Sequence, residues 1–265
     1  MKKVTGIRLH SQTEGERLYI DDDGELYISN TSLLSKYENK AGLDAWIERI
    51  GEEEANRIRD EASERGTLAH SEIEYYLEHN TYPEAISKYS KVAIEGFYGC
   101  TEIVEMEGLV AFNDGKVRFA GRFDQLLRIK PNTFRYIDST EFLPAKLLLC
   151  DLKTKAKAPT MEFSYIFKHL LQSSAYVVAK ELIEGICIDG IAIIFASPRT
   201  CKQVYLSREN IDYYWDMFYS MLEDYHKIKP LTQTWERMIA GAEYCWDIET
   251  NSFNSKTPTQ IIKLP

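Results

Sequence analysis

Three residues whose chemistry suits hydrolysis stand at the ends of two predicted neighbouring strands. Asp124 ends the stretch Gly121–Asp124, while Asp151 and Lys153 end an apolar run that begins at Leu147. Residues i and i+2 of a strand point to the same side, so Asp151 and Lys153 leave the sheet together and Asp124 can join them. Carboxylates bind hard cations, which polarise a phosphoryl group and activate water, and a lysine can orient that water. This set of residues therefore predicts metal-dependent hydrolysis of a phosphodiester.

The Asp-x-Lys pattern has a second interpretation, which is a salt bridge at the exposed end of a strand. Its sequence context favours a functional site, because Asp151 follows four apolar residues and therefore ends a buried strand. Ligand sites in α/β sheets tend to lie at such strand ends. We therefore expect the active site at this edge of the sheet.

Hydrophobic periodicity predicts the helices and strands that position these residues. Helical spacing of apolar residues is found after the cap residues Asn30–Ser32 and in segments 43–50, 52–79, 87–98, 161–184 and 208–228. Gly66 interrupts the longest of these segments. Strand patterns occupy residues 103–112, 117–129, 134–137, 146–153, 188–196 and 203–206, and residues 1–30 are predicted to form a hairpin or two short strands.

This order of elements predicts an α/β fold with a central mixed β-sheet flanked by helices, as a single domain over residues 1–265. Residues 1–64 are expected to form an N-terminal hairpin and a helical cover, and residues 65–228 the core that holds the site. The tail, residues 229–265, contains Trp235, Tyr244 and Trp246, so we expect it to pack on the core.

Composition and charge narrow the class of protein. The chain has 265 residues, 44% of them hydrophobic, and a net charge of -9. It has no apolar run near the roughly 18 residues that span a membrane, and no signal segment precedes the acidic cluster Asp21–Asp23, so we expect a cytoplasmic protein. The acidic balance argues against a general polyanion binder, but a local basic patch can still bind nucleic acid.

Five short elements follow one another in an order that resembles the RecB-like branch of the PD-(D/E)XK nucleases. They are Gly66-Thr-Leu-Ala-His70, Glu107-Gly-Leu-Val, Gly121-Arg-Phe-Asp124, Asp151-Leu-Lys153-Thr154 and Gln172-Ser-Ser-Ala-Tyr176. The upstream blocks Ser32–Leu34, Leu43–Trp46 and Gly51–Asn56 resemble the mitochondrial genome maintenance exonuclease group and its phage counterparts. The resemblance covers about residues 28–180 and implies a restriction-endonuclease-like fold with an N-terminal helical extension, in a prokaryotic or phage-infected cell.

The resemblance also implies roles for the matching residues at the metal. His70, Glu107, Asp124 and Asp151 would ligate one or two Mg²⁺ or Mn²⁺ ions, assisted by the Leu152 carbonyl. His70 is alternatively a phosphate contact or an ordinary histidine on a helix surface. Glu105 is an alternative to Glu107, because the two are predicted to share a face of their strand. Lys153 would position the nucleophilic water.

A second group of residues is expected around that centre. Gln172 and Tyr176 lie one helical turn apart and would steady Lys153 or contact the DNA backbone, or else pack between helix and sheet. DNA contacts are further expected from Gly66, Arg122, Thr154, Lys155 and Lys157. Lys168 and His169 complete a predicted basic rim, although they can equally form a solvated face.

Other cofactors are not expected. The iron–sulfur relatives carry three clustered downstream cysteines, whereas Cys187, Cys201 and Cys245 are widely spaced, so we predict no iron–sulfur cluster. A phosphate-binding loop of the pattern GxxxxGK[ST] is missing from the sequence, so we predict no ATP motor.

Three functions fit these patterns. The first is a DNA exonuclease that prefers single-stranded ends, the second a structure-specific endonuclease on the same scaffold, and the third an inactive protein that binds DNA ends. The first is favoured by the segment before Gly66, because helices 43–50 and 52–62 have apolar stripes that can dock on the sheet. Such a cover would leave a narrow passage for a single strand.

Overall fold

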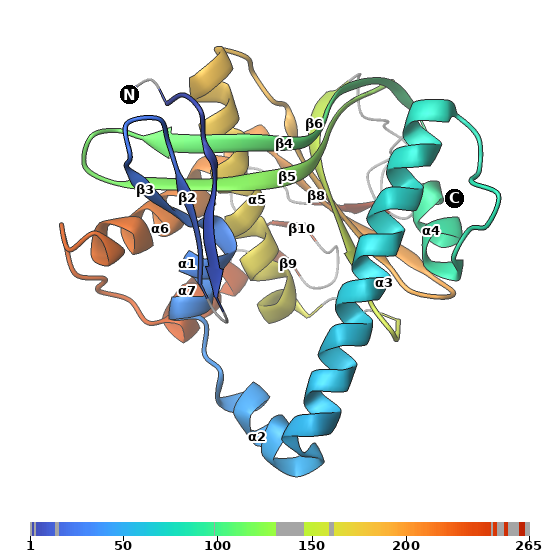
Figure 1. Ribbon diagram of the computed structural model, residues 1–265, viewed down its shortest axis with the longest axis horizontal. Helices are drawn as coiled ribbons and strands as arrows, with labels where there is room; N and C mark the ends of the chain where they lie inside the picture. The colour runs from blue at the N-terminus through green and yellow to red at the C-terminus, as the bar shows by residue number, and fades with distance from the viewer. Residues whose placement is uncertain are drawn as a thin grey trace.

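The computed structural model describes residues 2, 4–13, 16–97, 99–130, 146–158, 162–244, 246–247, 252–253 and 260–262. Within these residues, a mixed sheet of nine strands forms the centre of the molecule, in the order β1-β2-β3-β5-β6-β7-β8-β11, with β4 paired to β5 (Figure 1). The strands of this sheet are β1 (Arg8–Thr13), β2 (Glu16–Ile20), β3 (Leu26–Ser29), β4 (Cys100–Asn113), β5 (Arg118–Ile129), β6 (Lys146–Thr154), β7 (Gly190–Ala196), β8 (Cys201–Ser207) and β11 (Gln260–Ile262). A separate pair is formed by β9 (Trp246–Asp247) and β10 (Ser252–Phe253).

Helices cover both faces of this sheet, which confirms the predicted α/β class. They are α1 (Asn30–Tyr37), α2 (Ala41–Ile50), α3 (Glu52–His79), α4 (Lys88–Ala93), α5 (Phe163–Glu184), α6 (Arg208–Tyr225) and α7 (Trp235–Tyr244), with a 3-10 turn η1 (Ile94–Phe97). The cores of the two faces are separate. One core packs α1, α5, α6 and α7 on the sheet, and the other packs α3, α4 and η1 on the opposite face.

The central strand β6 contributes side chains to the cores on both faces of the sheet. It pairs antiparallel with β5 and parallel with β7, so the sheet is mixed. Its residues alternate between the cores: Leu147 and Leu149 contact the α5 side, and Leu148 and Leu152 contact the α3 side. A strand with apolar residues on both faces is typical of a sheet covered by helices on each side.

Two elements differ from the expectation along the chain. The N-terminal segment forms three strands, because Asp21 accepts a hydrogen bond from the Glu25 backbone N–H at 2.8 Å and closes a second turn before β3. The long helix α3 continues through Gly66 without a break. A helix glycine costs only about 1 kcal/mol relative to alanine, and burial of Ala69 and Ile73 against the sheet stabilises the next turns. The predicted strand at 134–137 lies outside the described residues.

The N-terminal helices form an arm and not a cover on the sheet. Figure 1 shows α2 and the first half of α3 projecting away from the sheet. No residue of α2 is buried, and the Leu43 side chain is 52% exposed. The expectation that both stripes dock on the sheet is therefore wrong. Among the described residues, the α2 helix contacts α3 and not the sheet, and its apolar residues Trp46, Ile47 and Ile50 are only half-buried.

The chain after α6 returns to the body of the molecule. Trp235 at the start of α7 is buried, and its ring packs edge-on against Phe167 of α5, with centroids 5.3 Å apart. Further along, β11 pairs with β8 at the edge of the sheet. None of the helices in the part of the chain that the structure describes is long and apolar enough for a membrane crossing.

Candidate functional site

The candidate site lies where β5 and β6 separate. The two strands pair from Ile129 and Lys146 as far as Gln125 and Cys150. At the next position the Asp124 carboxylate accepts a hydrogen bond from the Leu152 backbone N–H at 2.7 Å, in place of a backbone acceptor. The side chain of Asp124 is therefore held in the fork between the strands, and its exposed fraction is only 14%.

Asp151 and Lys153 meet in this fork, as their spacing predicts. The Asp151 side chain is 2% exposed, and its Oδ2 lies 2.6 Å from the Lys153 Nζ. Burial opposes a positive charge on Lys153, but Asp151 and Asp124 outweigh it and raise the pKa of the ammonium group. The lysine is therefore a cation at neutral pH, fixed beside the carboxylate.

The two buried carboxylates also act on one another. Burial, followed by the negative charge of Asp151, raises the pKa of Asp124 to about 6. The positive charges of Lys153 and His70 act in the opposite direction but do not cancel this effect. Asp124 and Asp151 together therefore hold more negative charge than their neighbours compensate, and a bound cation would relieve this excess.

His70 of α3 reaches the fork from the face of the sheet opposite α5. Its Nε2 lies 3.1 Å from the Leu152 carbonyl oxygen, and its Nδ1 lies 3.6 Å from Asp124 Oδ2. A carbonyl oxygen only accepts hydrogen bonds, so the His70 Nε2–H donates to Leu152, and the Nδ1 atom faces Asp124. This arrangement leaves a nitrogen ligand beside the carboxylate.

Glu74 of α3 lies beside His70 and Glu107, although the sequence patterns did not predict it as a ligand. One ligand atom each of His70, Glu74 and Glu107 lies within 4.8 Å of the others. Burial, followed by the charge of Glu107, raises the pKa of Glu74, so these two carboxylates also repel one another. The signal was present in the sequence, because residues four apart on a helix share a face and Glu74 follows His70 by four.

Glu107 and Glu105 point to opposite faces of β4, which corrects the expectation that they share one. Glu107 lies with His70 on the α3 side, whereas Glu105 contacts the buried Lys180 of α5, which also contacts Glu184. The backbone of Glu107 has a φ of 50°, and the register of β4 against β5 shifts between Ile103 and Glu105. These irregularities break the alternation that a regular strand would have. Glu105 is therefore not a candidate ligand.

Gln172 and Tyr176 lie behind the fork on α5. The Gln172 amide donates to the Tyr176 hydroxyl at 3.3 Å. The Tyr176 side chain is 2% exposed and packs on Gly121 of β5, where an added Cβ would lie 2.6 Å from the ring. Tyr176 therefore has a packing role, and the expectation that it touches DNA is wrong.

The predicted basic residues divide into exposed and buried groups. The Arg122 guanidinium is 53% exposed and lies 3.6 Å from Glu107, and Lys157 is exposed beyond the end of β6. His169 is buried, and this burial, with the charges of Lys153 and Lys168, holds its pKa well below the usual range. His169 is therefore neutral and does not belong to the basic rim, because α5 turns it toward the sheet.

Gly66 of α3 lies beside Thr154 at the end of β6, and both were predicted as DNA contacts. A Cβ added at Gly66 would lie 4.0 Å from the Thr154 hydroxyl oxygen, which is an ordinary contact distance. In the described residues, Gly66 is thus not required by a close approach of protein atoms.

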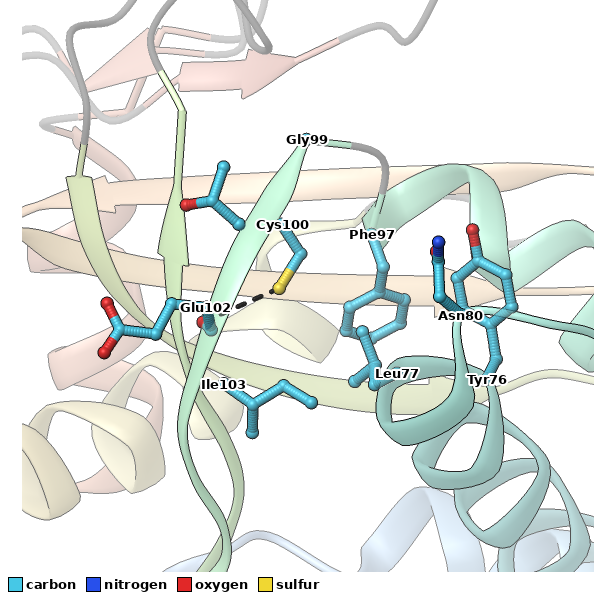
Figure 2. A pocket seen from close by; sticks show the side chains of 9 residues that line it. Tyr76, Leu77, Asn80, Phe97, Gly99, Cys100, Glu102 and Ile103 are labelled. Atoms are coloured by element: carbon cyan, nitrogen blue, oxygen red, sulfur yellow. Dashed lines mark hydrogen bonds between the residues drawn. The ribbon is translucent and has the colours of Figure 1, made fainter.

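A separate pocket of about 420 Å³ lies beside the C-terminal end of α3 (Figure 2). Tyr76 and Leu77 of α3 line it together with Asn80, which follows α3, and Phe97, Cys100 and Ile103 line it from η1 and β4. None of the predicted site residues lines this pocket. It is therefore distinct from the fork between β5 and β6.

Comparisons with known proteins add little to this geometry. No family model matches the sequence, and no curated protein matches it. Among the solved structures that match is one described as the crystal structure of SSO0001, with 13% sequence identity and a TM-score of 0.38. The match covers 81% of this chain and 79% of that one, and at this similarity it carries no functional argument.

Proposed function

We propose that this protein is a metal-dependent nuclease that hydrolyses phosphodiester bonds from DNA ends and prefers single strands. The observation that carries the proposal is the meeting of Asp124, Asp151 and Lys153 in the fork between β5 and β6. Burial and the charge of Asp151 raise the pKa of Asp124 to about 6, so a negative charge on Asp124 is unfavourable while no cation is bound beside it. Such groups are typical of catalytic sites.

The residues present fit a divalent metal. Oxygen and nitrogen donors lie around the fork, from Asp124, Asp151, the Leu152 carbonyl and His70. Two further carboxylates, Glu74 and Glu107, lie beside His70. Oxygen-rich donors of this kind suit Mg²⁺ or Mn²⁺. When bound, such an ion would supply charge neutralisation at the phosphoryl group and activation of water.

The protein's own residues would divide the remaining work. Lys153 is held as a cation by Asp151, so it can orient a water and stabilise negative charge that develops on the phosphate. The Arg122 guanidinium is exposed at the rim beside Glu107, where it can contact a neighbouring phosphate. Tyr176 and Gln172 support β5 from behind, so that Asp124 keeps its position.

The experiment that tests this function is digestion of an end-labelled single-stranded oligonucleotide. Cleavage should be lost in EDTA and restored by Mg²⁺ or Mn²⁺. Lys153→Ala should lower the cleavage rate by orders of magnitude while DNA binding is largely preserved, and Asp151→Asn should also weaken metal binding. Lys116→Ala, at the exposed β4–β5 turn, is the matched control and should cleave like the wild type. Full activity in EDTA, or a fully active Lys153→Ala, would contradict the proposal.

A further inference from the structure

Beyond Lys153, Arg65 and Lys155 are two cations next to the end of β6, where α3 passes close to that strand: a Cβ added at Gly66 would lie 4.0 Å from the Thr154 hydroxyl oxygen. Arg65 lies on α3 and is half-buried, and its Nε is buried with no hydrogen-bond partner. Its guanidinium carbon lies 5.4 Å from the centre of the Tyr89 ring. In the described part of the chain, no carboxylate forms an ion pair with Arg65 or with Lys155.

Lys155 has a similar environment on the other side. It is half-buried, and its Nζ lies 3.3 Å from the centre of the Tyr165 ring of α5. Burial, followed by the positive charges of Lys168 and Arg65, lowers the pKa of Lys155 to about 8. The third cation, Lys168, is already held by Glu38 at 3.1 Å. Of these three cations, Arg65 and Lys155 are the two that form no ion pair with a carboxylate in the described residues.

Like charges that are partly removed from water and lack counter-ions are unfavourable unless a ligand supplies the opposite charge. A guanidinium in this situation is suited to a phosphate, because its planar donors match two phosphate oxygens. An ammonium adds a compact second charge. We propose that Arg65 and Lys155 form an anion subsite that binds the backbone phosphate next to the one at the fork. This inference rests on the proposed function and deepens it.

The position of the subsite agrees with a strand that runs through the fork. Lys155 follows Lys153 by two residues, which in an extended chain corresponds to about 7 Å along the same side. That distance is on the scale of one nucleotide step in an extended single strand. The Lys155 backbone N–H donates to the Ala196 carbonyl at 2.8 Å, so the backbone at this position is tied to β7. The subsite is thus built on the same framework as the fork.

The subsite can be tested by binding, without any cleavage. Fluorescence anisotropy of a labelled single-stranded oligonucleotide in Ca²⁺ gives the affinity at several salt concentrations. For Arg65→Gln and Lys155→Gln we expect a several-fold weaker affinity, and a log–log salt slope that is smaller by about 0.7 for each lost phosphate contact. Arg59→Gln on the same helix, exposed on the arm, is the matched control and should keep the slope. Arg65→Lys should keep the slope but bind more weakly, because it retains charge and loses the planar donors.

A second experiment, with an uncharged methylphosphonate linkage in the oligonucleotide, identifies which backbone phosphate the subsite binds. Oligonucleotides that carry one methylphosphonate, moved one position at a time, should show one position that weakens binding to the wild type but not to the double variant Arg65→Gln, Lys155→Gln. Equal losses for wild type and variant at every position would overturn the subsite, even if the protein proves to be a nuclease. If the protein cleaves no nucleic acid with any metal, the nuclease proposal fails, and the binding comparison still decides the subsite.

Discussion

Asp124 and Asp151 show at the residue scale how burial changes the behaviour of an ordinary side chain. Both are carboxylates, but Asp151 has Lys153 as a direct partner, whereas Asp124 has a backbone N–H and lies in the field of its neighbour. Burial, followed by the negative charge of Asp151, raises the pKa of Asp124 to about 6. Two carboxylates buried side by side therefore cost stability in a protein without a bound cation.

This cost gives a prediction for Asp124→Asn. Burial and Asp151 raise the pKa of Asp124 to about 6, above its ordinary value of 3.8. Below pH 3.8 Asp124 is protonated in both the folded and the unfolded chain, and the stability of the metal-free protein is fully present. As pH rises through 6, the folded protein must hold a buried negative charge, and this stability is lost. Without metal, Asp124→Asn should raise the free energy of unfolding by roughly 2 kcal/mol at pH 8, and the difference should shrink toward pH 4. Thermal or urea unfolding in EDTA measures it. A variant that is less stable than the wild type at pH 8 would contradict the assigned repulsion.

A second prediction concerns Glu74, which faces His70 and Glu107. If it belongs to the metal centre, Glu74→Gln should weaken Mn²⁺ affinity by roughly tenfold or more, since outer and inner ligands contribute on this scale. Glu78→Gln, one turn further along α3 and exposed, is the control and should bind Mn²⁺ normally. Titration calorimetry gives both affinities. Equal values for the two variants would remove Glu74 from the site.

The residues that sequence patterns could select are those whose direction follows from strand geometry alone. Asp151 and Lys153 meet because i and i+2 share a side, and this rule holds along β6. The same rule fails for Glu105, because a positive φ at Glu107 is a local irregularity with no sequence signature such as glycine. The burial of His169 and Tyr176 depends on how α5 is rotated against the sheet, which periodicity does not determine for a helix buried almost all round.

At the scale of elements, the site depends on how closely α5 approaches β5. Gly121 allows this approach, because the Tyr176 ring occupies the space where a side chain would be. The strand can therefore lie close to the helix while Phe123, two residues on, packs in the same core. Asp124 follows directly, so the packing of a small residue positions a charged one.

Gly121→Ala should consequently destabilise the protein by about 1 to 3 kcal/mol, which is the usual cost of overpacking a core. An added Cβ would lie 2.6 Å from the ring of Tyr176, whose buried side chain has little room to move. Gly42→Ala in α2 is the matched control, since nothing lies within 4 Å of its added Cβ and alanine is favoured in a helix. It should leave stability unchanged or raise it slightly. Chemical unfolding of both variants measures the difference, and a neutral Gly121→Ala would show that α5 yields easily.

The element pattern was predictable where periodicity is strong and unpredictable where tertiary contacts decide. The strands around the site and the long helices α3, α5 and α6 were predicted close to their observed bounds. The placement of α2 was not, because an amphipathic stripe indicates that a helix packs against something without indicating what. In this protein Trp46 and Ile47 lie on a helix that packs on α3.

At the scale of the whole molecule, the arm is anchored at both ends. Before α2, Leu33 and Leu34 of α1 are buried in the core, and the Tyr37 hydroxyl donates to Asp224 of α6 at 2.6 Å. After α2, the second half of α3 is fixed by Ala69 and Ile73 in the opposite core. The arm therefore connects the two faces of the sheet as a closed arch, and opening it would require α1 or α3 to leave its core.

This arrangement leads to the last prediction, which concerns the ends of the substrate. A strand that passes under an arch anchored at both ends must enter by a free end, so a linear single-stranded oligonucleotide should be shortened progressively. A single-stranded circle of the same sequence should survive, and one cut in that circle should make it a substrate. A blunt duplex should be degraded more slowly, because it is wider and stiffer than a single strand. Gel analysis of labelled substrates at low salt, where phosphate contacts are strongest, gives the rates. Cleavage of the circle as fast as the linear strand would contradict threading and favour an endonuclease on the same site.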